Sequence, residues 1–271
     1  MSNSLPSWYA GFFRFGHLAK GIIYLIIGGL AIATVIGASG SIEGGRGVIK
    51  WINEQTFGRI LLGLIAVGLF SYTAWRWLKV FLGKGGDEDD KKDTVYRVAW
   101  FFSGLSYLGL GILAARSAIN GGTSGSQGGG KRQEIITWLM QQSWGPTVVI
   151  ILGVIIAGVA IFQLIKGIQK KFLDNIDLSS ASHKERETIE KLGIVGHVAR
   201  AVVFGIMAYF LILAGATVDP QKFKGTEGAL EWLNQNTYGT ILLALAAAGL
   251  IAYAIFTLAK AKYPPAGAKE Q

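Results

Sequence analysis

The sequence predicts an all-α membrane protein: six transmembrane helices arranged as three parallel two-helix hairpin repeats, with short interfacial helices on the outer side. The 271-residue chain is 51% hydrophobic and only 16% charged, which is too apolar for an ordinary soluble domain. Six runs lack Asp, Glu, Lys, Arg and His, and their lengths are near the roughly 20 residues that a spanning helix requires. A motif that begins with Trp and ends with Gly occurs three times: WINEQTFG (51–58), WLMQQSWG (138–145) and WLNQNTYG (232–239).

We expect each charge-free run to be the apolar part of one helix. In hydrocarbon the backbone must satisfy its own hydrogen bonds, and continuous apolar runs lack the alternation of a barrel strand. Arg14 and Lys20 before the first run resemble the start of a signal peptide, but the same pattern returns at Arg200 inside the chain, so we interpret the first run as a span. The runs are Gly21–Ala38, Ile60–Trp75, Val98–Ala115, Pro146–Ile165, Ala201–Val218 and Thr240–Ala259.

The internal repeat predicts three hairpins, at 11–81, 98–168 and 191–261, joined by cytoplasmic linkers at 82–97 and 169–190. Each unit consists of a helix, a Gly-rich loop, the Trp motif and a second helix. The first helices align through FGHLAKGIIY (15–24), FSGLSYLGLG (102–111) and VGHVARAVVF (195–204). In the second linker, Ser182 and Glu185 predict the capping box of a short cytoplasmic helix that ends near Leu192.

Lys and Arg predict the orientation. They favour the side that holds both termini and both linkers by more than two to one over the opposite side. Because positive residues favour the cytoplasm, we expect both termini to be cytoplasmic. An even number of spans then makes the three hairpins parallel, related by rotation about the membrane normal.

The three Trp motifs lie on the predicted outer side, before the second helix of each hairpin. Indole rings favour the membrane–water interface, so we expect Trp51, Trp138 and Trp232 to be interfacial anchors. Apolar spacing around them predicts a short helix in the interface, ended in each copy by the Gly of the motif: Gly58, Gly145 and Gly239.

Four basic or titratable residues are the candidate lipid- or partner-binding site. His17 and Lys20 share one face of the first helix, and His197 and Arg200 repeat that face in the fifth. Ionisable groups inside a span are costly and mark binding sites, although near a helix end they can also snorkel to water. The middle repeat has Gly104 and Tyr107 at these positions.

Catalytic and cofactor chemistry finds little support. The chain has no Cys, and no nucleophile, base and orienting group can be named together. His17 and His197 on different helices could be axial haem ligands, but no other feature supports that reading. We therefore expect a protein that is not an enzyme, with no catalytic residues, no metal, no cofactor and no nucleic-acid partner.

The triplicated unit resembles a bacterial membrane family of unknown function built from three copies of a two-helix domain. The resemblance rests on His-x-x-Lys/Arg before the first span and on Trp-x-x-x-x-Thr/Ser-aromatic-Gly before the second, over about residues 11–261. It implies a multi-pass protein of the bacterial cytoplasmic (inner) membrane. It implies no substrate, cofactor or catalytic residue.

Two functions remain open. The first is a non-enzymatic scaffold or accessory subunit that binds lipids, including anionic lipids, or a membrane partner protein. The alternative is a transporter or channel for a small solute, built as a pseudo-three-fold helix bundle. No span has the Pro break or the intramembrane acid that would mark a coupling site, so we favour the scaffold.

Overall fold

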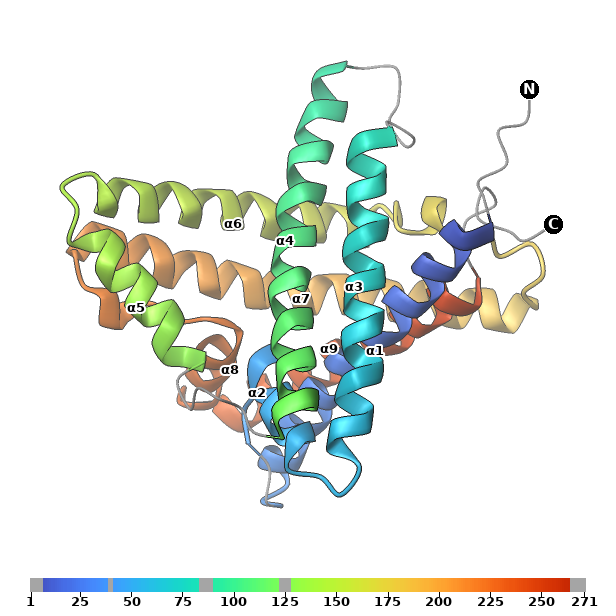
Figure 1. Ribbon diagram of the computed structural model, residues 1–271, viewed down its shortest axis with the longest axis horizontal. Helices are drawn as coiled ribbons and strands as arrows, with labels where there is room; N and C mark the ends of the chain where they lie inside the picture. The colour runs from blue at the N-terminus through green and yellow to red at the C-terminus, as the bar shows by residue number, and fades with distance from the viewer. Residues whose placement is uncertain (1–6, 39–40, 83–89, 122–127, 264–271) are drawn as a thin grey trace.

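Long helices dominate the protein. The computed structural model describes residues 7–38, 41–82, 90–121 and 128–263, and within these residues the regular structure is helical, without strands (Figure 1). Each predicted charge-free run lies mainly or wholly within a long helix: α1 (Ser7–Val35), α3 (Gly58–Leu82), α4 (Asp90–Asn120), α6 (Gly145–Ile168), α7 (His183–Thr217) and α9 (Gly239–Lys262). The remaining elements are three short α-helices and two 3-10 turns: α2 (Gly45–Asn53), α5 (Gly128–Met140), α8 (Thr226–Asn234), η1 (Leu173–Asn175) and η2 (Pro220–Lys222).

The expectation of an all-helical fold with several apolar spans is confirmed. Five stretches of the described residues are long and apolar enough to cross a membrane: Gly11–Val35, Gly58–Leu78, Gly145–Ile168, His183–Thr217 and Gly239–Lys262. The predicted sixth run lies in α4, and its span stays a prediction.

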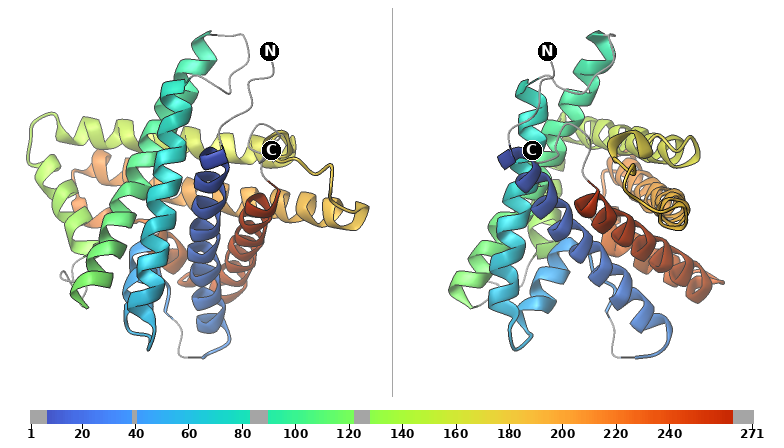
Figure 2. Two further views of the ribbon diagram at one scale, coloured as in Figure 1. Left: turned by 45° about the vertical axis from the view of Figure 1, so that its right-hand side comes forward. Right: turned by 90° about the vertical axis from the view of Figure 1, so that its right-hand side faces the viewer.

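The long helices pack in pairs that cross the repeats. The most extensive contacts join α6 with α7, α1 with α9 and α3 with α4, so the first helix of each repeat packs on the second helix of another. In the right-hand view of Figure 2, the α1–α9 pair lies between the α3–α4 pair and the α6–α7 pair. The α3–α4 pair and the α6–α7 pair run in different directions in Figure 1, and the arrangement of three hairpins about one membrane normal therefore stays a prediction.

Within the repeats the packing is unequal. The helices of repeat 1, α1 and α3, pack together, as do α7 and α9 of repeat 3. In the part of the chain that the structure describes, α4 and α6 of repeat 2 form no comparable interface. A ring of six helices would need that contact, so the ring is open at the second repeat.

Two glycines explain the close approach of α1 to α3. A Cβ atom added at Gly16 would lie 2.7 Å from the Tyr72 Cα, and one at Gly68 would lie 2.4 Å from the Ala19 Cβ. Such distances are far shorter than van der Waals contact, so only glycine allows the backbones to come this near.

Repeat 3 has the same pair of glycines between α7 and α9. A Cβ atom at Gly196 would lie 2.5 Å from the Tyr253 Cα, and one at Gly249 would lie 2.2 Å from the Ala199 Cβ.

Repeat 2 has larger side chains at both glycine positions. The alignment of the repeats places Ser103 where the first helices have glycine, and Ile155 where the second helices have glycine. These side chains would keep α4 and α6 apart, which gives a physical reason for the open ring.

The Gly of each Trp motif belongs to a tight turn that is the same in all three repeats. The amide of Gly58 donates to the Gln55 carbonyl at 2.8 Å, and the corresponding bonds at Gly145 and Gly239 measure 2.9 and 2.7 Å. Added Cβ atoms at these glycines would lie 1.7 to 1.9 Å from a carbonyl oxygen of the preceding chain. The short helices end earlier than predicted, at Asn53, Met140 and Asn234, and each glycine instead begins the following long helix.

Two of the short helices are part of the main core. Val48, Ile49 and Ile52 of α2 are fully buried, as are Ala229 and Leu230 of α8. They pack in one cluster with apolar residues of α1, α3 and α9. Their apolar faces are therefore covered by protein, and α2 lies beside α8 near the lower edge of the view in Figure 1.

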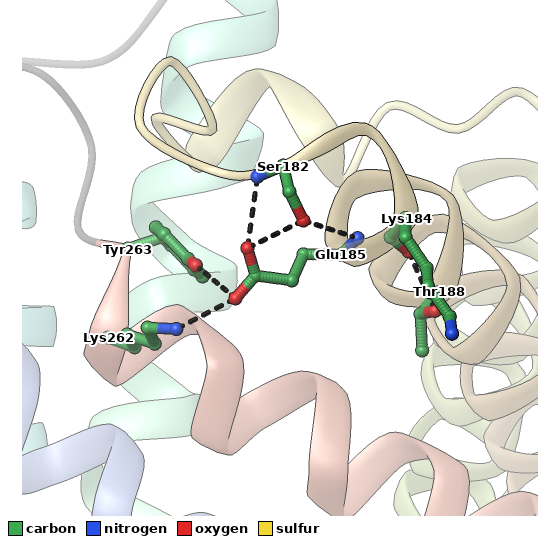
Figure 3. A network of polar contacts seen from close by, with 6 residues as sticks. All are labelled: Ser182, Lys184, Glu185, Thr188, Lys262 and Tyr263. Atoms are coloured by element: carbon green, nitrogen blue, oxygen red, sulfur yellow. Dashed lines mark hydrogen bonds and ion pairs between the residues drawn. The ribbon is translucent and has the colours of Figure 1, made fainter.

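The predicted capping box at Ser182 and Glu185 is confirmed (Figure 3). The Ser182 hydroxyl accepts from the Glu185 amide at 3.3 Å, and the Glu185 carboxylate accepts from the Ser182 amide at 2.9 Å. The prediction of a short helix that ends near Leu192 is wrong, because α7 continues without a break to Thr217. Gly193 directly after Leu192 does not end the helix; it stays helical where the Phe172 ring packs against it, and a Cβ atom there would lie 2.3 Å from that ring. The remaining residues of α7 contain no proline, and they pack against α6 and α9.

Candidate functional site

Lys20 lies near the middle of α1 and is only 5% exposed. Its ammonium group donates to the Tyr253 hydroxyl at 2.9 Å and to the Tyr72 hydroxyl at 3.3 Å. The same nitrogen lies 5.1 to 5.5 Å from the ring centroids of Tyr72, Tyr107 and Tyr253. Phenol oxygens and ring faces from α3, α4 and α9 thus surround one buried charge.

Two arginines share these tyrosines. Arg76 donates to the Tyr72 hydroxyl through Nε at 3.1 Å and Nη2 at 2.7 Å, and Arg200 donates to the Tyr253 hydroxyl at 2.6 Å. The Arg200 guanidinium also lies 4.3 Å from the Tyr253 ring centroid and 5.4 Å from that of Tyr24. We call this group the cation–tyrosine cluster; its members are Lys20, Arg76, Arg200, Tyr24, Tyr72, Tyr107 and Tyr253.

Among the described residues, the side chains that make up the cluster include three cations and no acidic group. Four ion pairs of the described residues lie elsewhere: Lys170 with Glu190, Lys191 with Glu187, Lys222 with Asp219 and Lys262 with Glu185. Tyrosine hydroxyls satisfy hydrogen-bond donors, but they leave the net charge of the three cations in place. The arrangement is therefore suited to an anion.

His17 and His197 lie beside the cluster in separate aromatic surroundings. The Nδ1 atom of each ring lies 2.7 Å from a carbonyl oxygen of its own helix, that of Phe13 or of Gly193. The His17 ring stacks on Phe13 at 4.0 Å between centroids and meets the rings of Tyr72 and Trp75 edge-on. The His197 ring stacks on Phe172 at 5.0 Å and meets Tyr253 and Phe256 edge-on. Both histidines are thus packed side chains that support the tyrosines.

The three predicted anchors differ in their surroundings. Trp51 and Trp232 are partly buried against the main core, and Trp232 meets the Phe210 ring edge-on at 5.7 Å. Trp138 is 58% exposed. Their role at a membrane interface stays a prediction.

The structure thus brings Lys20 and Arg200 of the predicted site onto one tyrosine, Tyr253, from two different helices. Sequence reasoning missed the tyrosines and Arg76 as partners. The sequence did contain a signal for the tyrosines. Tyr72 follows Gly58 by 14 residues and Tyr253 follows Gly239 by 14, so the two tyrosines occupy equivalent positions of repeats 1 and 3. Tyr107 replaces the cation in repeat 2, and it still packs against Tyr72 at 4.6 Å between ring centroids.

Comparison with known proteins agrees with this repeated architecture. The model of the Domain of Unknown Function family DUF1206 matches the chain three times, at residues 15–83, 98–170 and 195–264. The chain is also 29% identical to the uncharacterized protein YxxB of Bacillus subtilis (strain 168) over 256 residues, which cover 94% of this chain and 91% of that protein. No solved structure matches the chain. Three matches that together cover most of the sequence, on a helical fold repeated three times, show that the chain belongs to the DUF1206 family.

Proposed function

We propose that this chain is a non-enzymatic scaffold or accessory subunit of the bacterial inner membrane whose cation–tyrosine cluster binds the anionic headgroup of a phospholipid. One observation carries the proposal: Lys20, Arg76 and Arg200 converge on two tyrosine hydroxyls with no acidic side chain among them. Unpaired charge inside a membrane protein is costly, and a bound phosphate would lower that cost.

The chemistry of the cluster supports binding over catalysis. The guanidinium groups of Arg76 and Arg200 stay charged at any physiological pH, so they cannot take a proton as a general base. They are, however, well suited to hold phosphate oxygens through several N–H donors. The transporter alternative gains no support from these contacts, because Lys20 is packed against three tyrosine rings.

The test removes two charges while it keeps hydrogen-bonding side chains. We expect Lys20→Gln with Arg200→Gln to lower the amount of phosphatidylglycerol that co-purifies with the protein, measured by native mass spectrometry. The matched control is Lys184→Gln with Lys191→Gln, which removes two exposed charges of α7. Equal lipid retention in both double variants, at equal thermal stability, would disprove the proposed function.

A further inference from the structure

The open second repeat changes the surroundings of Arg200. In repeat 1, Lys20 bonds to the tyrosine of its own repeat, Tyr72, and to the tyrosine of the neighbouring helix α9, Tyr253. Arg200 is the equivalent cation of repeat 3, and its neighbouring helix is α6. There the tyrosine position is Val159, 14 residues after Gly145. Arg200 thus bonds to one tyrosine, and its Nε atom is buried without a hydrogen-bond partner.

Lys166 is a second cation near Arg200. It lies close to the end of α6, next to Gly167, where an added Cβ atom would lie 3.0 Å from the Cβ of His197, three residues before Arg200 in α7. Its ammonium group lies 5.8 Å from the ring centroid of Phe162. Lys166 and Arg200 therefore bring positive charge to the place where α6 packs on α7.

The helices that fail to pair expose apolar side chains. On α6, going from Lys166 toward the predicted outer side, Val159 is 39% exposed, Ile155 56% and Leu152 40%. On α4, Leu105 and Ile112 are 47% and 41% exposed, but their counterparts on the paired helix α1, Leu18 and Leu25, are 40% exposed as well, so the exposure specific to the seam lies on α6. A ligand at this seam thus meets positive charge at one end and a run of apolar residues beyond it.

We infer that repeat 2 is specialised to bind one anionic phospholipid at the seam between α4 and α6. The phosphate accepts from Arg200 Nε and pairs with Lys166, and the acyl chains lie along the apolar residues of α6 and α4. Charge complementarity selects the occupant, because a phosphate with attached hydrocarbon matches both ends of the seam, at the level of the predicted inner leaflet. The inference rests on the proposed function. It adds where the phospholipid binds and that one phospholipid binds per chain.

The variant that tests the inference places a tyrosine at residue 159, where repeats 1 and 3 have one. Val159→Tyr offers Arg200 a second phenol and fills the place of the phosphate, so we expect the affinity for phosphatidylglycerol to fall about tenfold, as for one lost hydrogen bond to a charged group. Lys166→Ala should lower it by a similar factor. Ile161→Tyr is the matched control, because Ile161 is an exposed residue of the same helix. Val159→Leu tests whether a change of side chain alone disturbs the site, and we expect it to bind as the wild type does.

The measurement is titration of the purified full-length protein with phosphatidylglycerol, followed by native mass spectrometry, with phosphatidylcholine and inorganic phosphate as parallel probes. We expect one tightly bound phosphatidylglycerol, weak phosphatidylcholine binding and no displacement by inorganic phosphate.

Displacement of phosphatidylglycerol by inorganic phosphate would identify a soluble anion site and overturn the inference. Wild-type affinity in both Val159→Tyr and Lys166→Ala would also overturn it. If those two variants bound as the wild type does while Lys20→Gln with Arg200→Gln still retained less phosphatidylglycerol, the proposed function would stand. A change from dimer to monomer in Val159→Tyr, at unchanged lipid affinity, would assign the seam to a second copy of the chain instead.

Discussion

Lys20 shows how a single buried cation is accommodated in this protein. A lysine inside a span can extend its side chain toward water, and the sequence allowed that reading. In the structure the ammonium group instead donates to two tyrosine hydroxyls and lies near three tyrosine rings, between α1, α3, α4 and α9. Its orientation is determined by residues that lie 52 and 233 positions away in the chain.

A second feature at the residue scale is the close contact at Gly196. An added methyl group would overlap the backbone of α9, and overpacking of this kind costs about 1–3 kcal/mol. We expect Gly196→Ala to lower the free energy of unfolding by that amount, measured by chemical denaturation in detergent.

Gly205 of the same helix provides the matched control. A Cβ atom there would meet nothing within 4 Å, so Gly205→Ala should leave the stability unchanged or raise it by up to about 1 kcal/mol. If the two variants were equally stable, glycine contacts would not explain the pairing of α7 with α9.

At the scale of elements, Glu185 joins the beginning of α7 to the end of α9 (Figure 3). Besides the capping box, its carboxylate accepts from Lys262 at 2.9 Å and from the Tyr263 hydroxyl at 3.0 Å. One carboxylate thus stabilises two helix ends that are 77 residues apart in the chain.

We therefore expect Glu185→Gln to increase hydrogen exchange in two places at once: the first turns of α7 and the last turn of α9. The amide keeps some hydrogen bonds but loses the charge that attracts Lys262 and the helix N-terminus. Glu187→Gln is the control, because Glu187 pairs with Lys191 of its own helix. Faster exchange at α7 alone would show that the contact with α9 contributes nothing.

At the scale of the whole molecule, the most extensive helix contacts join different repeats. Helices α1, α4 and α7 each pack on the second helix of another repeat, so no hairpin is an independent unit. The chain closes through α1 and α9, which brings the first and last long helices together. Among the described residues, α4 and α6 form the weak junction of the ring, and this is also the junction without the paired glycines.

The predicted orientation is testable on the intact chain. A green fluorescent protein fused after Gln271 should fluoresce, because it folds in the bacterial cytoplasm but not after export in an unfolded state through the general secretion route. Alkaline phosphatase at the same position should be inactive. Active phosphatase would reverse the orientation inferred from Lys and Arg.

Much of the fold follows from local sequence. The charge-free runs predict the long helices, the three Trp motifs predict the repeat, and Ser182 with Glu185 predicts a helix start that the structure contains. The end of that helix was predicted wrongly, since Gly193 after Leu192 does not end it but lies inside α7, packed against Phe172. The turn glycines were recognised, but their role in a close backbone approach required coordinates.

The sequence by itself determined which segments are helical and apolar, because these properties depend on neighbouring residues and on hydrocarbon as a solvent. Only the tertiary structure decided which helices meet, because every long helix has an apolar surface and packing in a membrane depends on detailed shape. Differences at single equivalent positions decide which helices pack: repeat 1 has glycine at residue 68 and tyrosine at residue 72, where repeat 2 has isoleucine at residue 155 and valine at residue 159. The cation–tyrosine cluster and the open seam of the second repeat are the consequence, since both arise from contacts between distant parts of the chain.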